Sequence, residues 1–528
     1  MKKRIFIILV TVIMTIGAVF GCAQKYPELD VQETPDAKYA VTSNGGMVVQ
    51  KGDFIYFVNG YKPIEDTDGK NNVWGKVEKG GIYYAKLVGG KEKEVVDYYG
   101  KYLTYDNSDN NFDEEFSGFY TEAKTYTDEN DKEQTRQQIA VYPVVSKLVT
   151  NGGYAEGGIF IIDDYIYYAS PTTKRDKKGN VQYELVDFFR TRLDGTGTQY
   201  LYTSKSSEQK PVYGYYKYNN DVYAVFYEPS EQKIYSVKIK DNKTVQKPQV
   251  LADEVTGAVL PQKDVYFDGI SQDMPEDYIY YTREIDIEKD ENLTEGNVLE
   301  RVRPDGSERK SVVTGANIIL DKVSNGRLFY FIDGYQYTAN RYYFAVDLTD
   351  FDQRQPVEIF YELSDSFPES VFGVVYGPND LLALALKNSS VVLYIAGQEA
   401  GKTVYKENKA KILYVDNNDA YFAVNDSGGD DFSLVNLYKI NYFNERYEKL
   451  PQNTIKLDFL NIDIAGGYLF YVSTINEIAQ TIKSGDKEVT ILAKTDYYIR
   501  LQNLNSASKT EWDMGWLDKE DYPEEYKK

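Results

Sequence analysis

The chain has 528 residues, of which 42% are hydrophobic and 27% are charged, and its formal net charge is −22. Such an acidic surface repels nucleic-acid phosphates and anionic lipid headgroups, so we expect no nucleic-acid partner and no charge-driven membrane binding. The sequence has no histidine and one cysteine, which excludes Ser-His-Asp triads, Cys-His pairs, intramolecular disulfides and thiolate metal sites.

The first 21 residues have the pattern of a secretory signal peptide. Met1-Lys2-Lys3-Arg4 precedes a nearly continuous apolar run from Ile5 to Phe20, which is shorter than the roughly 20 residues that a membrane-spanning helix needs. The sole cysteine, Cys22, follows directly after Gly21. We therefore predict an exported protein, with an ordinary signal peptide and an incidental cysteine as the alternative.

Val19-Phe20-Gly21-Cys22 resembles the lipobox of bacterial lipoproteins, although Phe20 replaces the small residue usual at that position. The resemblance implies cleavage before Cys22 and a diacylglyceryl group on its sulfur. Two acyl chains anchor a protein stably to a bilayer, so the expected location is the extracytoplasmic side of the cell membrane. Residues 22–43 contain Pro27 and Pro35 but no apolar periodicity, and we predict that they form a flexible tether.

The rest of the chain repeats one β pattern, a turn dipeptide followed by four or five aromatic or aliphatic residues. Tyrosine, present 51 times, favours strands because its ring packs on a sheet while its hydroxyl reaches water. Apart from the first gap, the repeats lie about 40 to 57 residues apart, which is the length of a four-stranded propeller blade. The eight dipeptides are Gly52-Asp53, Asp163-Asp164, Asn220-Asp221, Glu276-Asp277, Asn325-Gly326, Asn379-Asp380, Asn418-Asp419 and Gly466-Gly467.

A second motif predicts the outer hairpin of two blades. Phe189-Arg190-Thr191-Arg192-Leu193-Asp194-Gly195-Thr196 is echoed by Leu299-Glu300-Arg301-Val302-Arg303-Pro304-Asp305-Gly306-Ser307. These hairpins and the Tyr-Ile-Tyr-Tyr strands resemble the β-propeller domains of Firmicutes lipoproteins, which are similar to DUF5050 and TolB-like propellers. The resemblance covers residues 44 to 508 and implies a fold, with no activity attached.

We therefore predict an all-β protein with a propeller of seven or eight four-stranded blades over residues 44–508. Two β-sandwiches or an irregular β array are the alternatives. Residues 97–153 are too long for one blade, so we predict an insertion with a small strand at Ile139–Tyr142, either functional or merely tolerated. Residues 509–528 form an acidic tail whose tryptophans cover a blade edge or dock a partner.

Three Asp/Asn clusters, at 66–71, 106–109 and 425–431, lack the EF-hand spacing, so solvated turns are the simplest interpretation. Asp426, Asp430 and Asp431 are the first candidates if calcium binds, and we expect no other cofactor. The expected function is non-catalytic: a membrane-anchored binding or scaffold propeller for an envelope protein, a peptide or a glycan. A carboxylate-dependent glycan hydrolase or lyase on the same scaffold is the alternative, and an accessory of an envelope machine is a third hypothesis.

Overall fold

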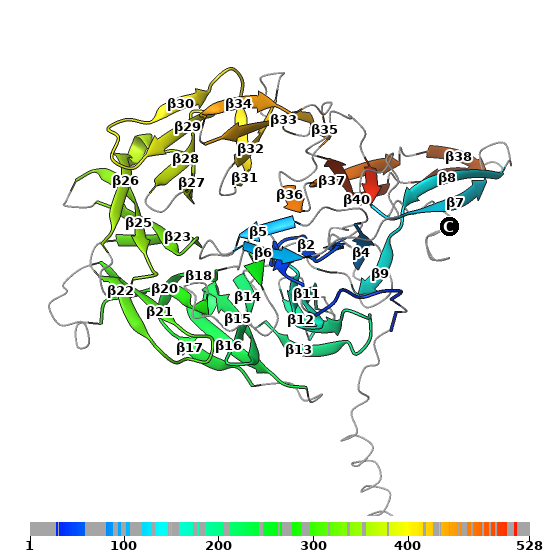
Figure 1. Ribbon diagram of the computed structural model, residues 1–528, viewed down its shortest axis with the longest axis horizontal. Coiled ribbons are helices and arrows are strands. Elements are labelled where there is room, and N and C mark those ends of the chain that lie inside the picture. The colour runs from blue at the N-terminus through cyan, green and yellow to red at the C-terminus, as the bar shows by residue number, and fades with distance from the viewer. Residues whose placement is uncertain are drawn as a thin grey trace, which may run out of the picture.

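The structure is a computed structural model of the chain. It describes residues 28–29, 31–37, 39–58, 81–87, 93–96, 102–105, 119–127, 133–145, 147, 149, 158–172, 177–178, 185–204, 212–241, 247–261, 265–266, 277–286, 296–314, 317–334, 338–350, 355–376, 380–415, 419–425, 432, 434–442, 444–450, 455–456, 462–465, 468–477, 480–484, 487–491, 494–503 and 512–514. Within these ranges the strands form eight antiparallel sheets of at least four strands, arranged in a ring (Figure 1). The predicted all-β propeller is confirmed.

We number the blades in chain order and give their strands from the innermost outward. Blades 1 to 4 contain β2 (Val48–Lys51), β3 (Phe54–Val58), β4 (Ile82–Lys86) and β9 (Tyr142–Val145); β10 (Phe160–Ile162), β11 (Tyr165–Pro171), β12 (Val186–Arg192) and β13 (Gln199–Thr203); β14 (Val212–Tyr218), β15 (Asp221–Glu228), β16 (Lys233–Ile239) and β17 (Gln249–Ala252); and β18 (Val255–Val259), β20 (Ile279–Glu284), β21 (Asn297–Val302) and β22 (Lys310–Thr314).

Blades 5 to 8 follow the same plan. They contain β23 (Asn317–Ser324), β24 (Arg327–Asp333), β25 (Asn340–Asp347) and β26 (Val357–Leu363); β27 (Ser370–Val375), β28 (Leu381–Lys387), β29 (Ser390–Ile395) and β30 (Lys402–Tyr405); β31 (Ala410–Val415), β32 (Asp419–Val424), β33 (Leu434–Asn441) and β34 (Arg446–Lys449), with β35 (Ile455–Lys456) also pairing with β33; and β36 (Ile462–Ala465), β37 (Tyr468–Glu477), β40 (Lys494–Asn503) and β41 (Trp512–Met514).

Two short strands extend blade 1 inward, past the ring of inner strands. β2 contacts the inner strands of both neighbouring blades, β10 and β36, so it is the inner strand of blade 1. β1 (Val41–Thr42) pairs with the open edge of β2, and β19 (Val265–Tyr266) pairs with β1. β19 belongs to the connection between β18 and β20 of blade 4, so this connection crosses the centre of the ring to reach blade 1.

Alternating strand direction gives the ring two distinct faces. Connections between strands 1 and 2 and between strands 3 and 4 of each blade share one face, which we call the hairpin face. Connections between strands 2 and 3 and from one blade to the next share the other, the loop face. Several hairpin-face turns are tight, and Asn219 and Asn220, like Asn325 and Gly326, have the positive φ that two-residue hairpin turns require.

Several predicted boundaries need correction. The insertion runs from after β4 to before β9, because β9 is the fourth strand of blade 1. It carries β5 (Lys93–Val96), β6 (Tyr102–Tyr105), β7 (Thr121–Thr127) and β8 (Glu133–Ile139). The predicted single strand at Ile139–Tyr142 is wrong, because β8 ends at Ile139 and β9 begins at Tyr142, with two non-strand residues between them. β41 lies beyond residue 508, so the propeller extends into the predicted tail. A further hairpin, β38 (Gln480–Ser484) with β39 (Lys487–Ile491), forms a separate two-stranded sheet in the connection between β37 and β40.

Two predicted turns are also wrong. The third dipeptide is shifted by one residue, because the turn is Asn219-Asn220 and Asp221 already pairs with Tyr218. The fourth is no tight turn, since the connection from β18 to β20 spans residues 260–278 and contains β19.

Tyrosines pack the seams between blades more deeply than the sequence suggested. Tyr168 and Tyr280 are fully buried, and Tyr215 donates a hydrogen bond of 3.1 Å to the Tyr168 carbonyl of the preceding blade. Phe188 stacks on Phe226 at 5.3 Å between blades 2 and 3. The expectation that tyrosine hydroxyls reach water is wrong for Tyr168 and Tyr215, because their hydroxyls bond Thr191 and the Tyr168 carbonyl. Each such ring pair is worth about 0.5–1.5 kcal/mol beyond its buried area.

Candidate functional site

The predicted site residues lie outside the described part of the chain. This holds for Cys22 and for the calcium candidates Asp426, Asp430 and Asp431, as for the clusters at 66–71 and 106–109. In the residues that are described, no group of three or more His, Cys, Asp or Glu side chains has metal-binding geometry. The strongest feature that the structure does describe is the seam between blades 1 and 2, where the N-terminal segment lies.

The N-terminal segment, residues 28–43 (Figure 1, dark blue), begins on the hairpin face of this seam. The Leu29 amide donates to the carbonyl of Gly195 at 3.4 Å, in the outer hairpin of blade 2. Farther along, the Glu33 amide donates to the Tyr84 hydroxyl at 3.1 Å, and the Lys86 ammonium bonds the Glu33 carboxylate at 2.8 Å. Pro35 is buried. The prediction of a flexible tether over all of 22–43 is therefore wrong for its described residues from Leu29 onward.

From there the chain enters the centre of the ring. The Gly52 amide donates to the carbonyl of Ala40 at 3.3 Å, and β1 then runs antiparallel to β2 toward the loop face. At its far end the buried Asn44 side chain accepts from the Ile161 amide at 2.8 Å and donates to the Ile161 carbonyl at 3.0 Å. The segment thus runs from the rim of blade 2 through the whole depth of the propeller before the first blade begins.

An ionic cluster joins the first three blades at the hairpin face. The ammonium of the fully buried Lys51, from blade 1, donates to the carbonyl of Asp163 in blade 2 at 3.1 Å. Lys217 of blade 3 forms an ion pair with the carboxylate of the same Asp163. Sequence reasoning identified Asp163 only as a turn residue. The positive φ of 54° at Asp163, which Asp tolerates better than most residues, gives it this position between two lysines.

A second buried cation lies in the same seam, toward the loop face. Lys147 is 4% exposed and places its ammonium 4.7 Å from the centre of the Phe189 ring. Burial lowers the pKa of Lys147 to about 8, although the nearby Asp187 carboxylate opposes the shift. Asp187 is itself buried and accepts a 2.5 Å hydrogen bond from Thr203. No motif marked Lys147, because its burial depends on the packing of two blades.

The repeated arginine motif forms the same cluster in blades 2 and 4. In blade 2 the Arg190 and Arg192 guanidinium carbons lie 4.2 and 5.5 Å from the Tyr165 ring centre. In blade 4 those of Arg301 and Arg303 lie 4.0 and 3.6 Å from the Tyr278 ring centre. Cation–π contacts of this kind are worth about 0.5–2 kcal/mol, more when desolvated.

The turn after each arginine pair is closed by its acidic residue. The Asp194 carboxylate accepts from the Thr196 amide at 2.9 Å, and the Asp305 carboxylate accepts from the Ser307 amide at the same distance. Sequence reasoning missed a third copy in blade 5, where Asp347 accepts from the Thr349 amide at 2.8 Å. The signal was present as Asp-x-Thr, but Leu348 replaces the glycine that drew attention to the other two.

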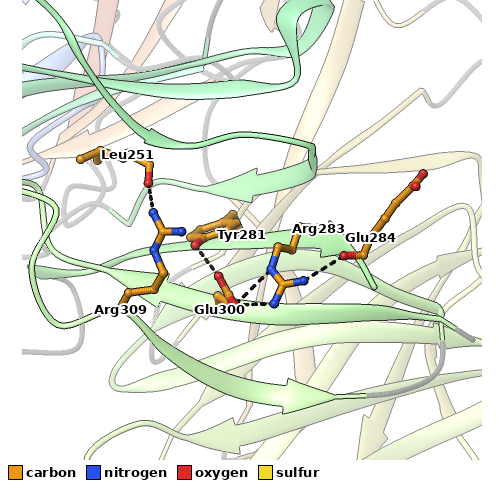
Figure 2. A network of polar contacts seen from close by, with 6 residues as sticks. All are labelled: Leu251, Tyr281, Arg283, Glu284, Glu300 and Arg309. Atoms are coloured by element: carbon orange, nitrogen blue, oxygen red, sulfur yellow. Dashed lines mark hydrogen bonds and ion pairs between the residues drawn. The ribbon is translucent and has the colours of Figure 1, made fainter. Parts of the chain in front are cut away.

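Blade 4 also contains a buried carboxylate that is fully engaged (Figure 2). One oxygen of Glu300 accepts from Arg283 at 2.8 and 3.1 Å, and the other accepts a 2.5 Å hydrogen bond from Tyr281. Arg309 donates to the Leu251 carbonyl of blade 3 beside this network. Because both Glu300 oxygens are occupied by protein donors, we interpret this ion pair as part of the packing between blades 3 and 4.

Among the described carboxylates with a resolved pKa shift, Asp321 of β23 is the one whose pKa is raised, because it is buried. The Tyr343 hydroxyl donates to it at 2.5 Å. A glycosidase pair requires a second carboxylate roughly 5 to 9.5 Å away, and the partner that the structure gives Asp321 is a tyrosine.

The known proteins that this chain resembles are similar to it at low sequence identity. No family model and no curated protein matches the sequence. Solved structures similar to the chain include the β-propeller domain of the Trilobed protease from Pyrococcus furiosus, with 10% identity, a TM-score of 0.35, and coverage of 78% of this chain and 98% of that one. A puromycin-hydrolyzing peptidase of Mycobacterium tuberculosis matches with 9% identity and a TM-score of 0.34, over 60% of this chain and 48% of the peptidase. This chain therefore spans about half the length of that peptidase.

A dihydro-heme d1 dehydrogenase is also similar, with 10% identity, a TM-score of 0.32, and coverage of 80% of this chain and 75% of that one. Across the described ranges, no helix has the length and apolar character needed to cross a membrane.

Proposed function

We propose that this chain is an exported lipoprotein, anchored through a diacylglyceryl group on Cys22, whose propeller is a non-catalytic binding or scaffold module. The observation that carries the anchor is the position of the only cysteine in 528 residues, directly after a basic start, an apolar run and Gly21. Cleavage before Cys22 would leave six residues, 23–28, between the anchor and the first contact of Leu29 with blade 2.

The binding role rests on connections of variable length around a regular scaffold. On the hairpin face the turns between the first two strands of blades 1, 2, 3 and 5 are two residues long, as at Asp163, while the insertion of blade 1 and residues 260–278 of blade 4 are long connections on the same face. On the loop face the connections vary widely, from the two residues between β28 and β29 to residues 172–185 between β11 and β12 and 59–81 between β3 and β4. A regular scaffold with variable loops is typical of proteins that bind through those loops. An envelope protein, a peptide or a glycan is the expected partner.

Cys22→Ala tests the anchor. We expect the variant to leave the membrane fraction or to accumulate as the uncleaved precursor, because the acyl attachment site is gone. Lys177→Cys, which adds a thiol on an exposed loop-face residue, is the control and should fractionate as the wild type does. Normal cleavage and continued membrane association of Cys22→Ala would refute the anchor.

The binding role needs its own test. Purified protein should retain a specific ligand from a glycan array or an envelope-peptide library and release no new reducing ends from it. Turnover of a glycan substrate would establish the alternative, a carboxylate-dependent hydrolase or lyase.

A further inference from the structure

The point at which the chain leaves the propeller lies on the hairpin face. Leu29 is fixed to Gly195 by its backbone hydrogen bond, and Val31 packs against the same glycine, so closely that a Cβ on Gly195 would lie 2.8 Å from the Leu29 oxygen and from Val31 Cγ2. Gly195 is in the turn between strands 3 and 4 of blade 2. The preceding chain therefore starts from the rim of the hairpin face, beside blades 1 and 2.

The reach of the chain before this point is limited. Six residues lie between Cys22 and Leu29, and the seven Cα–Cα steps across them span at most about 25 Å when fully extended. The two faces are roughly 25 Å apart, since strands of seven or eight residues rise about 3.3 Å per residue. To bring the loop face against a bilayer, the chain would have to use its whole reach to pass over the rim, so its exit point places the hairpin face nearer the bilayer.

Three lysines on the hairpin face near the exit point are paired with carboxylates within the protein. Lys86 is paired with Glu33, Lys217 with Asp163, and Lys238 with Asp221. These cations are therefore engaged by carboxylates and do not add a strong attraction to headgroups. The orientation of the propeller is therefore set by the packing of the N-terminal segment and by the short chain between Cys22 and Leu29.

We propose that the hairpin face of blades 1 to 3 lies toward the lipid surface and that the loop face is presented away from the membrane. This inference rests on the proposed anchor at Cys22 and identifies the surface that remains open to a partner. It predicts that a partner contacts the loop-face connections, including residues 172–185, and leaves the tight hairpin turns untouched.

Two cysteine variants of the full mature protein test the orientation, since the native thiol is acylated in the proposed form. Lys240→Cys places a probe at the hairpin-face end of blade 3, and Lys177→Cys places one on the loop face of blade 2; both lysines are exposed. Each variant is labelled with a donor fluorophore and inserted into the outer leaflet of phosphatidylcholine–phosphatidylglycerol vesicles that carry a headgroup acceptor. We expect the Lys240→Cys probe to transfer at least about twofold more efficiently, because the faces are one strand length apart.

Equal or reversed transfer in vesicle-bound protein would overturn the orientation and leave the anchor intact. Failure of both variants to co-sediment with vesicles would instead refute the anchor, and the orientation with it. A third variant carries a Gly/Ser insertion of about 20 residues between Cys22 and Leu29, which adds roughly 25 Å of root-mean-square reach. The difference between the two probes should then shrink toward zero, and a difference that persists unchanged would show that the short reach does not set the orientation.

Discussion

Blades 2 and 4 contain the same arginine motif, but different parts of the chain pack on its hairpin. In blade 4 the Asp305-Gly306 hairpin packs on the preceding blade, where a Cβ on Gly306 would lie 2.8 Å from Gln249 and 3.5 Å from Leu251 of β17. In blade 2 the matching Gly195 meets Leu29 and Val31. The N-terminal segment thus takes the place that the outer strand of the neighbouring blade takes in blade 4.

The difference extends to the second arginine of each pair. Arg303 is 1% exposed, lies 4.8 Å from the Tyr218 ring centre of blade 3, and bonds Glu308 at 3.3 Å. Arg192, at the same position of the motif, is exposed. The motif therefore fixes the local hairpin, while the neighbouring chain decides whether its charge is buried.

The largest expected effect separates these two arginines. Arg303→Ala should lower the free energy of unfolding by about 3 kcal/mol, because it opens a cavity and breaks a buried charged network. Arg192→Ala should cost less than about 1 kcal/mol, since its charge is already solvated. Urea denaturation of both variants measures the contrast, and equal losses would contradict the difference in burial.

The second prediction concerns the seam of blades 1 and 2. The pKa of Lys147 is lowered to about 8 from 10.5, so between these values the unfolded chain binds more protons than the folded one. The Lys147 contribution to the free energy of unfolding should therefore rise with pH across that window, by about 3 kcal/mol at most.

Comparison with Lys147→Met isolates this effect from the buried tyrosines. Burial raises the pKa of Tyr83, for example, to about 12, so the tyrosine contribution has the opposite sign and is lost as pH rises above 10. The tyrosines are common to both proteins. A wild-type minus variant difference that stays flat from pH 8 to 10.5 would mean that Lys147 is not desolvated.

Glycine replacements then test what covers each hairpin. Gly195→Ala and Gly306→Ala share a strain of about 1 kcal/mol, because φ is +76° and +88°. The new methyl at Gly306 meets the end of a movable glutamine, whereas at Gly195 it meets the Leu29 backbone. Only Gly195→Ala should therefore release the N-terminal segment, and limited proteolysis should cut its residues 28–37 faster. Equal cleavage in both variants would argue against the packing of the N-terminal segment on Gly195.

The smallest effect concerns the closing aspartates. Asp194→Ala and Asp305→Ala each remove a carboxylate that accepts from a backbone amide and a hydroxyl, and each should cost about 1 kcal/mol. The similar cost is expected because both hairpins are locally alike. Thermal unfolding beside Asp305→Asn, which keeps an acceptor, checks the assignment, and a cost confined to one blade would break the equivalence.

Much of the fold follows from local sequence signals. Turn dipeptides and the strands after them predicted seven or eight blades, and Asp-Gly pairs predicted two outer hairpins. β19 was missed because a two-residue strand that crosses the ring has no periodicity, and the N-terminal segment because its contacts all lie in distant blades. Lys147 and the role of Asp163 arise from packing between sheets, which local patterns do not encode. The predicted calcium candidates and Cys22 lie outside the described residues and stay predictions.

The chain next to the proposed anchor is built into the propeller through backbone hydrogen bonds. Hydrogen exchange followed by mass spectrometry on membrane-bound protein tests it directly, through the amides of Glu33, Gly45 and Ile161. These amides should exchange far more slowly than those of an unstructured chain, because Tyr84, Ile159 and Asn44 accept hydrogen bonds from them. Exchange of Glu33 and Gly45 at the rate of a free peptide, with Ile161 unprotected, would contradict it.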